Sequence, residues 1–337
     1  MKRKVYRLKA GNIKNLQLIE ENLPDPNDNE VTIEVKAIGL NFADVFAIWG
    51  LYSATPEGEF TPGLEYAGVV AKVGKEVSHV KVGDAIMGVT RFGAYTSHLN
   101  IDSQYAIPLP KGWDFATGAS YLVQVLTAYY AMLRLGQLEK GQTVLIHSAA
   151  GGVGILANRI AKKYDCYTIG TVGGSHKLQR LNDEGYDKGI VRGKDFGDQL
   201  KKALAGRELN LVMECIGGDI MKAGFEALAP QGKSIIYGAA SYAHPGDRPN
   251  YLKLFWKYLR RPKIDAQSLA ELNKGVIGFN LIYLYEKAEL MYELLAELKE
   301  LDIEKPYVGQ TFPFEKLPEA IRTFKLGKTM GKVVVTV

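Results

Sequence analysis

The amino-acid sequence predicts an α/β protein built from one mostly β unit and one unit with a parallel sheet covered by helices. Its 337 residues exceed the roughly 250–300 at which a single core stops growing, so two units are expected. Short alternating runs fill the first part of the chain. Strand-like runs alternate with helical patterns in the middle part, which is typical of a parallel sheet with helices on both faces.

The β unit is predicted from short runs in which apolar and polar residues alternate, as in half-buried strands. These runs cover residues 31–37, 66–73, 84–89 and 95–101. Gly-rich or charged turns separate them. We therefore expect residues 1–118 to form a β unit.

The parallel-sheet unit is predicted from apolar runs that are followed by helical patterns. A βαβ rhythm of this kind brings the strands side by side with their carboxyl ends at one edge. We expect the unit to span residues 119–302. The strand-like runs are 144–147, 167–172, 211–215 and 234–238.

The last third of the chain changes character twice. Residues 263–269 are interpreted as an edge strand, and the amphipathic run 281–301 as a long helix. Residues 332–337 again have strand composition. We expect the tail, 303–337, to return to the β unit and make it discontinuous.

Composition and charge exclude several classes of function. The 42 basic and 37 acidic residues give a net charge of only +5, which is too small and diffuse to indicate a nucleic-acid partner. Cys166 and Cys215 are the only cysteines, and neither belongs to a Cys-x-x-Cys pair. No disulfide framework or structural zinc cluster is predicted, and the residues suit a reducing compartment, so we expect a cytoplasmic protein.

No membrane contact is expected, because no window offers the roughly 18 uncharged apolar residues that a spanning helix needs. One dense basic stretch covers residues 256–263. We interpret it as a solvated helix end. A contact with anionic lipid or phosphate is the alternative.

A dinucleotide site is predicted directly after the first strand of the parallel sheet. There the chain reads Ala149-Ala150-Gly151-Gly152-Val153-Gly154 and continues into an apolar helical pattern. Small residues let backbone N–H groups approach a pyrophosphate, and the helix N-terminus adds a favourable dipole. A purely structural turn is the alternative, but the strand–turn–helix context favours cofactor binding.

The end of the second strand favours NADPH over NADH. An NAD site places an acidic residue there to bind the ribose 2′-hydroxyl, and none lies between Cys166 and Asn182. Ser175 and Lys177 stand there instead, and Arg192 follows the next short strand. A hydroxyl and two cations suit a 2′-phosphate. In the alternative reading, Lys177 and Arg180 only decorate an exposed helix start.

Six motifs, in this order along the chain, carry a resemblance to a known family. The whole chain resembles the medium-chain dehydrogenase/reductase superfamily, in its quinone oxidoreductase branch, and is most similar there to vesicle amine transport protein homologues. The resemblance implies a GroES-like β domain (1–118 and 303–337), a Rossmann domain (119–302), an active site between them and a homodimer. The motifs lie at 39–44, 62–68, 82–84, 126–129, 149–154 and 278–280.

The resemblance also implies a protein without zinc. The places of the catalytic zinc ligands in zinc-dependent members look to be occupied by Asn41, Leu64 and Val123, none of which offers a usual N or S ligand. Without a Lewis acid, the hydride acceptor has to be electrophilic already. We expect a quinone or a conjugated enone or enal, with an enoyl thioester as the alternative.

By resemblance, Asn41, Asp44, Tyr52 and Thr127 surround the nicotinamide end of the cleft, and Gly238 and Phe279 lie along the cofactor. Tyr52 is the candidate proton donor, and Asn41 is the candidate to polarise the acceptor oxygen. Solvent is the alternative proton source. A Tyr52 that only lines an apolar pocket is the alternative to catalysis.

Two further residues of the expected site, Gln124 and Glu65, are interpreted separately. Gln124 stands where the family often has Asn, which keeps an amide but changes its reach. Glu65 is expected to satisfy backbone donors or to pair with a nearby cation.

A second functional hypothesis is a cofactor-binding interaction protein with little catalysis, for which the basic stretch 256–263 is the supporting feature.

Overall fold

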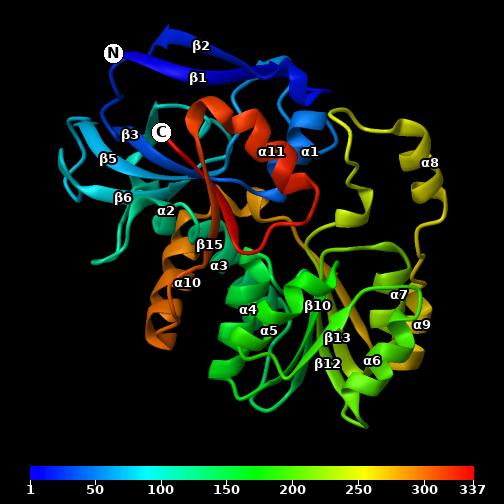
Figure 1. Ribbon diagram of the computed structural model, residues 1–337. Coiled ribbons are helices and arrows are strands. Elements are labelled where there is room, and N and C mark those ends of the chain that lie inside the picture. The colour runs from blue at the N-terminus through cyan, green and yellow to red at the C-terminus, as the bar shows by residue number, and fades with distance from the viewer.

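The computed structural model describes all residues from Met1 to Val337 and contains two large sheets joined by helices (Figure 1). The first is a six-stranded sheet in the order β11-β10-β9-β12-β13-β14, and every neighbouring pair is parallel. Its strands are apolar; all four residues of β9, for example, are buried. The strands are β9 (Thr143–Ile146), β10 (Tyr167–Val172), β11 (Lys188–Val191), β12 (Leu209–Glu214), β13 (Leu228–Ile236) and β14 (Gly275–Gly278).

Helices cover both faces of this sheet (Figure 1). Helix α4 begins directly after the turn that follows β9, and α3 packs against α4. On the other side, α6 and α7 pack together over a small cluster of buried residues. The helices of this part are α3 (Leu122–Tyr129), α4 (Gly152–Lys163), α5 (Leu178–Asp183), α6 (Phe196–Leu204) and α7 (Gly218–Ala227).

The second large sheet has seven strands and draws on both ends of the chain. Its order is β15-β16-β3-β5-β6-β8, and β7 also pairs with β3. Strand β16 pairs with β3 in an antiparallel manner, so the C-terminus lies beside the N-terminal third of the chain (Figure 1). The strands are β3 (Glu30–Gly39), β5 (Glu65–Val73), β6 (Ala85–Val89), β7 (His98–Asp102), β8 (Ile107–Pro108), β15 (Val308–Pro313) and β16 (Lys332–Thr336).

The remaining elements flank the two sheets. A small sheet, in the order β2-β1-β4, lies beside the seven-stranded sheet. Helix α1 follows β3, and α10 and α11 precede β15 and β16 in turn. These elements are β1 (Lys2–Lys9), β2 (Gln17–Asn22), β4 (Glu59–Phe60), α1 (Phe42–Trp49), α2 (Phe115–Gly118), α8 (Tyr251–Leu259), α9 (Ala266–Leu272), α10 (Ala288–Leu301) and α11 (Leu317–Lys325).

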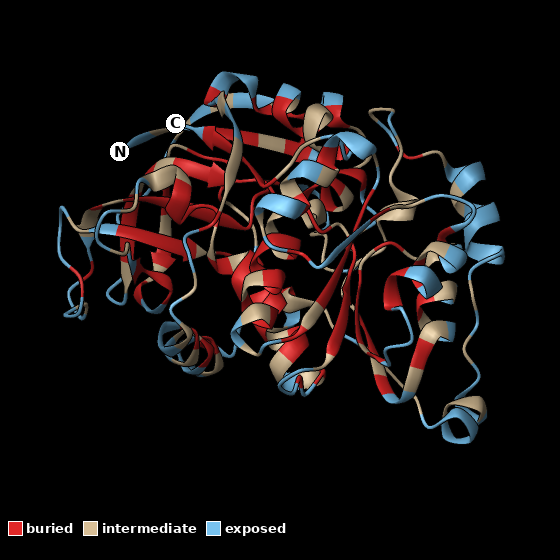
Figure 2. Ribbon diagram, turned by 60° about the horizontal axis from the view of Figure 1, so that its bottom comes forward, coloured by how far each residue is buried: buried red, intermediate tan, exposed pale blue.

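One buried core is shared between the two large sheets. A cluster of 63 residues runs from the seven-stranded sheet through α3 into the six-stranded sheet, so the two parts are packed together rather than joined by a free linker. Figure 2 shows the buried residues concentrated in the strands and in the helices between them. The cleft between the sheets therefore has a fixed frame.

The predicted α/β fold is confirmed, but two elements differ from the prediction. The long helix expected over 281–301 begins only at Ala288, as α10, after a 3₁₀ helix at Leu281–Leu284. Residues 263–269 were expected to form an edge strand, but α9 begins within them at Ala266. The side chain of Asp265 accepts a hydrogen bond from the backbone N–H of Ser268 and caps this helix. The edge strand of the parallel sheet is β14, which pairs with β13.

Candidate active site

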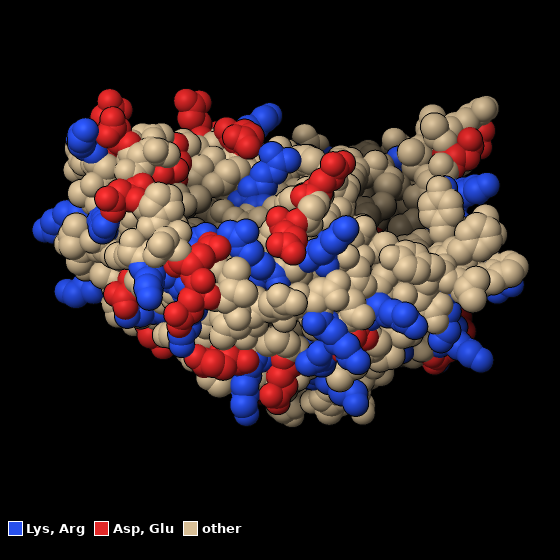
Figure 3. Space-filling model, turned by 90° about the horizontal axis from the view of Figure 1, so that it is seen from above, with Lys and Arg blue, Asp and Glu red and all other residues tan.

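A single deep cleft of about 1590 Å³ lies between the two large sheets. It is lined at the carboxyl ends of β9, β10, β12 and β13, and across from them by α1, α3 and the segment that leads into β16. Figure 3 shows a hollow on the face seen from above, surrounded mainly by uncharged residues. The carboxyl edge of a parallel sheet is where open α/β proteins bind their ligands.

The Gly-rich turn forms one wall of this cleft. It leads into the N-terminus of α4, where Gly152, Val153 and Gly154 have backbone N–H groups without a backbone acceptor. A Cβ on Gly154 would lie 2.6 Å from the carbonyl oxygen of Ser148, so only glycine lets the helix approach the turn this closely. Free N–H groups at a helix N-terminus suit a pyrophosphate, so these residues fit a dinucleotide.

The ends of the next two strands supply positive charge to the cleft, because Lys177 follows β10 and Arg192 follows β11. Arg192 lines the cleft, and its Nη1 donates to the carbonyl oxygen and the hydroxyl of Thr171, at 3.1 and 2.9 Å. Lys177 lines it too, and its Nζ donates to the carbonyl oxygens of Gly327 and Thr329, at 2.6 and 2.7 Å. Burial, and then the charge of Arg192, lower the pKa of Lys177 to about 8. Both cations therefore line a part of the cleft in which a bound anionic group would neutralise their charge.

The structure separates the expected cofactor residues into two groups. Gly151 to Gly154, Lys177, Arg192, Gly238 and Phe279 all line the cleft. Ala149 and Ser175 do not: Ala149 is fully buried beneath the turn, and its N–H donates to the carbonyl oxygen of Thr171 at 3.0 Å. Phe279 packs against Tyr130, with their ring centroids 5.3 Å apart.

Sequence reasoning missed the contribution of the C-terminal segment to this end of the cleft. Lys328 and Thr329 line it, together with His176 from the turn after β10. The N–H of Gly331 donates to the carbonyl oxygen of Ala150 at 2.7 Å and so attaches the segment to the Gly-rich turn. About 180 residues separate these groups along the chain, and no local signal points from one to the other.

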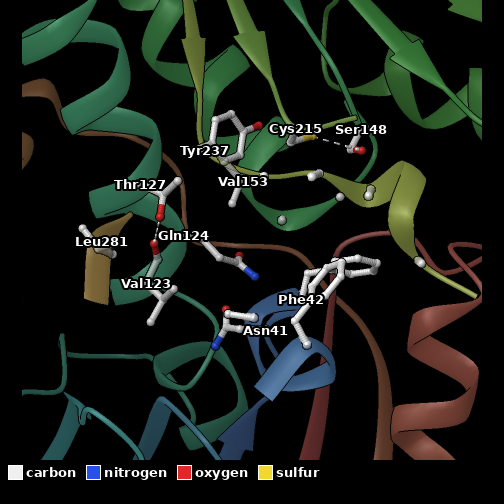
Figure 4. A pocket seen from close by; sticks show the side chains of 18 of the residues that line it. Asn41, Phe42, Val123, Gln124, Thr127, Ser148, Val153, Cys215, Tyr237 and Leu281 are labelled. Carbon is white, nitrogen blue, oxygen red and sulfur yellow. Dashed lines mark hydrogen bonds between the residues drawn. The ribbon is translucent and has the colours of Figure 1, made fainter. Parts of the chain in front are cut away.

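The three expected catalytic residues all line the other end of the cleft. The hydroxyl of Tyr52 donates to Asn280 Oδ1 at 2.6 Å, and burial raises the pKa of Tyr52 to about 12. The hydroxyl of Thr127 donates to the carbonyl oxygen of Val123 at 2.6 Å. Asn41 precedes α1, and Figure 4 shows its side chain close to that of Gln124 at the bottom of the cleft.

A buried cluster lies behind Asn41. Lys332 Nζ donates to Asn41 Oδ1 at 2.8 Å and to Glu65 Oε2 at 2.6 Å. The other carboxylate oxygen of Glu65 accepts the N–H of Val123 at 3.0 Å. Glu65 and Lys332 are 0% and 1% exposed. The expectation that Glu65 satisfies a backbone donor and pairs with a cation is confirmed, but the cation comes from the far end of the chain.

Asp44 is a second buried acid near this cluster. Its Oδ2 accepts the N–H of Asn41 at 2.8 Å, which forms part of the cap of α1. Burial raises the pKa of Asp44 to about 7, against the opposing effects of this N–H and of the charge of Lys332. Near neutral pH, Asp44 is therefore shared between its protonated and ionised forms.

The places of the family's zinc ligands come together in the structure. Asn41, Leu64 and Val123 all line the cleft. The amide of Asn41 binds the Lys332 ammonium, and the backbone N–H of Val123 binds Glu65. No group of three or more His, Cys, Asp or Glu side chains is arranged to hold a metal ion.

Helix α8 forms the outer wall of the cleft and carries the basic stretch. Leu254 and Tyr258 line the cleft, whereas Leu252 and Trp256 are 76% and 57% exposed. Arg260 follows the last residue of α8 directly, so the expected helix end is confirmed. The outer face of α8, however, is covered by apolar side chains. None of the helices has the length and apolar character that a membrane crossing requires.

Comparison with known proteins places this architecture in a family. Residues 27–111 match the alcohol dehydrogenase GroES-like domain, and residues 152–266 match the zinc-binding dehydrogenase family. The human synaptic vesicle membrane protein VAT-1 homolog is 33% identical over 93% of this chain and 80% of its own length. The chain belongs to the medium-chain dehydrogenase/reductase superfamily, in its quinone oxidoreductase and VAT-1-like branch.

Other members of this superfamily sharpen the placement. Quinone oxidoreductase 1 of Escherichia coli is 35% identical over 71% of this chain and 73% of its own length. The Escherichia coli quinone oxidoreductase solved with NADPH superposes with a TM-score of 0.86, at 28% identity, covering 99% of this chain and 100% of the other. The enoyl reductase CurK superposes with a TM-score of 0.84 at 27% identity, covering 99% of each chain. The fold is thus a GroES-like β domain with a Rossmann domain, and the protein is an NAD(P)H-dependent oxidoreductase.

Proposed function

We propose that this protein is an NADPH-dependent, zinc-independent reductase that transfers a hydride to a quinone or to a conjugated enone or enal. The observation that carries the proposal is the environment of Asn41, which contacts a lysine ammonium where zinc-dependent relatives have a metal ligand. The acceptor must then be activated by its own conjugation, because no Lewis acid polarises it.

The proposed preference for NADPH over NADH is based on the charged side chains at one end of the cleft. Lys177 and Arg192 lie at the end of the cleft beside the second strand, and no carboxylate stands among the residues there. We propose that they bind the 2′-phosphate of NADPH, with Lys328 from the C-terminal segment. The free N–H groups of Gly152 and Val153 would hold the pyrophosphate. When bound, NADPH supplies the hydride.

The protein's own groups orient the acceptor and supply a proton. The raised pKa of Tyr52 keeps its hydroxyl protonated at neutral pH, as a proton donor requires. Asn280 holds that hydroxyl in place at 2.6 Å. Thr127 and Asn41 also line the cleft, and we propose that they contact the acceptor. The apolar side chains around them exclude water from the transfer.

The experiment is a steady-state assay of purified protein with NADPH and with NADH. The acceptor panel contains benzoquinones, naphthoquinones, conjugated enones, an enal and an enoyl thioester. We expect turnover of quinones or enones with NADPH at least tenfold more efficient than with NADH, and no loss of activity after chelation of metals. Absence of turnover with every acceptor, by folded protein that binds NADPH, would exclude the enzyme. A preference for the enoyl thioester would favour the alternative acceptor, a class related to that of CurK.

We further propose a division into a GroES-like domain of residues 1–118 and 303–337 and a Rossmann domain of residues 119–302. The pairing of β16 with β3 supports the return of the tail. We also propose a cytoplasmic homodimer. Strand β14 ends the parallel sheet and leaves one edge unpaired, which a second copy could extend. Light scattering coupled to size exclusion tests the dimer.

A second candidate function is supported by α8. Its outer face exposes Leu252 and Trp256, and no acidic residue occurs between Asp247 and Asp265. An apolar helix face flanked by Lys and Arg suits an anionic bilayer surface. We propose co-sedimentation with phosphatidylserine vesicles as its test. Binding that is absent, or that survives charge reversal at Arg260 and Arg261, would exclude the membrane contact.

A further inference from the structure

The ammonium of Lys332 has a complete set of three partners in the interior. It donates to Asn41 Oδ1 at 2.8 Å and to Glu65 Oε2 at 2.6 Å. The amide of Gln124 becomes the third partner when its oxygen and nitrogen exchange places: the oxygen then accepts from Nζ at 3.0 Å, and the nitrogen donates to the carbonyl oxygen of Ser120 at 2.9 Å. That orientation follows the hydrogen-bond network, since it satisfies both ends of the amide. An ammonium has three N–H groups, so none is left over.

The backbone is built to bring Lys332 to this point. A Cβ on Gly39 would lie 1.8 Å from the carbonyl oxygen of Ala119 and 2.6 Å from Lys332 Cε, so a glycine in β3 is required by the close backbone approach and also leaves room for the lysine side chain. The preceding residue, Gly331, is bonded to the cofactor turn through the carbonyl oxygen of Ala150, at 2.7 Å. The same turn also contacts Gln124, because a Cβ on Gly152 would lie within 2.1 Å of that amide.

We propose that Lys332 is the positioning residue of the cleft floor, defined as Asn41, Glu65, Gln124 and Lys332. The ammonium orients the two cleft-lining amides in the way that a metal ion orients its ligands. This inference rests on the proposed function, because it assigns Lys332 to the hydride transfer described above. Lys332 itself does not line the cleft and acts through Asn41 and Gln124.

The partner set distinguishes this role from a simple ion pair. A buried pair for fold stability needs only Glu65, and apolar residues of similar volume often serve stability as well. Two of the three partners are instead amides that line the cleft. The terminal torsion of an amide is broad and roughly two-fold, so an amide side chain can present either its oxygen or its nitrogen.

Lys332 removes that ambiguity. With Oδ1 held by the ammonium, the nitrogen of Asn41 is directed to the carbonyl oxygen of Gly39, at 3.2 Å, and to Glu65 Oε2, at 3.4 Å. With its oxygen held in the same way, Gln124 keeps its nitrogen on Ser120. The acceptor and the nicotinamide then meet a floor of fixed polarity and shape, and small misplacements at such a surface reduce transfer strongly.

The test compares Lys332→Met, Lys332→Arg and the double variant Lys332→Met/Glu65→Gln. Lys332→Met alone leaves a buried carboxylate unpaired and is expected to be unstable. The double variant removes both charges and keeps the protein foldable. The control is Arg159→Met/Glu184→Gln, which removes a largely buried pair, 2.8 Å apart, between Arg159 on α4 and Glu184 directly after α5; neither residue lines the cleft. Melting temperature, NADPH affinity, kcat, KM and the isotope effect from 4-deuterated NADPH are measured for each.

We expect the double variant to bind NADPH within threefold of the wild type and to lose at least tenfold in kcat. Its KM should change less than threefold, and its deuterium isotope effect should rise. Lys332→Arg should recover part of kcat, and the control pair should keep it. A double variant with wild-type kcat and isotope effect would overturn the proposal.

A neutron structure of the double variant, in which amide oxygen and nitrogen are distinguished, gives a readout that does not depend on turnover. We expect one or both amides, of Asn41 and Gln124, to turn away from their present orientation. Unchanged amides would overturn the positioning role even if kcat fell. A wild-type protein without turnover would instead remove the proposed function, and this inference with it.

Discussion

The buried acid Asp44 gives the protein a pH-dependent contribution to stability that one substitution isolates. Its pKa is about 7 in the folded chain, against 3.8 for a free side chain. A raised carboxyl pKa means that folding favours the protonated form. The contribution is therefore fully present below pH 3.8 and is lost as the pH rises through 7, by about 1.4 kcal/mol per pH unit between these values.

Asp44→Asn removes this titration while keeping an acceptor for the N–H of Asn41. We expect the free energy of unfolding of the variant, minus that of the wild type, to rise with pH from about 4 to 7 and then level off. Urea denaturation at several pH values measures it. A constant difference across this range would contradict the raised pKa.

Arg192 offers a separate test of cofactor choice. Its Nη1 is held by the carbonyl oxygen and the hydroxyl of Thr171, which keeps the guanidinium at the lining of the cleft. A charge-assisted bond contributes about 1.5–3 kcal/mol, so Arg192→Gln should weaken NADPH binding by about tenfold to a hundredfold. NADH affinity, measured in parallel by fluorescence titration, should change less than threefold. Equal losses for both cofactors would show that Arg192 does not contact the 2′-phosphate.

At the scale of elements, α4 packs closely against the turn that precedes it. This is possible because Gly154, in the first turn of the helix, has no side chain. A Cβ on Gly154 would lie 2.6 Å from Ser148 O and 2.7 Å from Ala149 Cα, and backbone atoms at such distances have to move. We expect Gly154→Ala to lower the melting temperature by several degrees and to weaken NADPH binding at least tenfold. Thermal denaturation with and without NADPH measures both effects.

Gly197 in α6 is the matched control for that substitution. Its added Cβ would meet only the Cβ of Ala223, at 3.9 Å. Replacing a helical glycine by alanine where space exists stabilises by about 0.5–1 kcal/mol. Gly197→Ala should therefore raise the melting temperature slightly and leave NADPH affinity unchanged. Similar behaviour of the two variants would refute the steric argument for Gly154.

The elements also show which features a single sequence can predict. Local patterns predicted strands at β3, β5, β9, β10 and β16, because strand composition and periodicity are local features. Residues 263–269 were misassigned because the apolar positions of a short run are compatible with a strand and with a helix. Asp265 caps the N-terminus of α9 and so favours the helix. The β1–β2 hairpin was missed, since most of the β2 side chains are not buried and carry little apolar pattern.

The candidate site also contains residues that local motifs predicted and residues that they did not. The Gly-rich turn and the cations of the second strand end follow from local motifs, and those residues do line the cleft except Ala149 and Ser175. Lys332 was not foreseen as the partner of Glu65, because 267 residues separate the two. A lysine at the start of a C-terminal strand looks like a solvent-exposed residue in sequence. Only the pairing of β16 with β3 brings it inside.

At the scale of the whole molecule, the cleft ties the C-terminal segment to the cofactor turn. Gly331 bonds to Ala150 at 2.7 Å, and Lys177 bonds to the carbonyl oxygens of Gly327 and Thr329. The segment 326–331 therefore joins the two large sheets at the expected position of the cofactor. A ligand that contacts both sides should stabilise them as one body.

Hydrogen exchange followed by mass spectrometry tests this coupling. NADPH at a hundred times its dissociation constant contributes about 2.7 kcal/mol, which slows exchange by up to about a hundredfold wherever opening requires its release. We expect this protection in residues 326–331 as well as 148–154, whereas the β1–β2 hairpin, which lies outside the cleft lining, should exchange as before. Protection confined to 148–154 would mean that the cofactor binds the parallel sheet alone. The acceptor would then enter a cleft whose second wall moves independently, and the fixed floor around Lys332 could not align it.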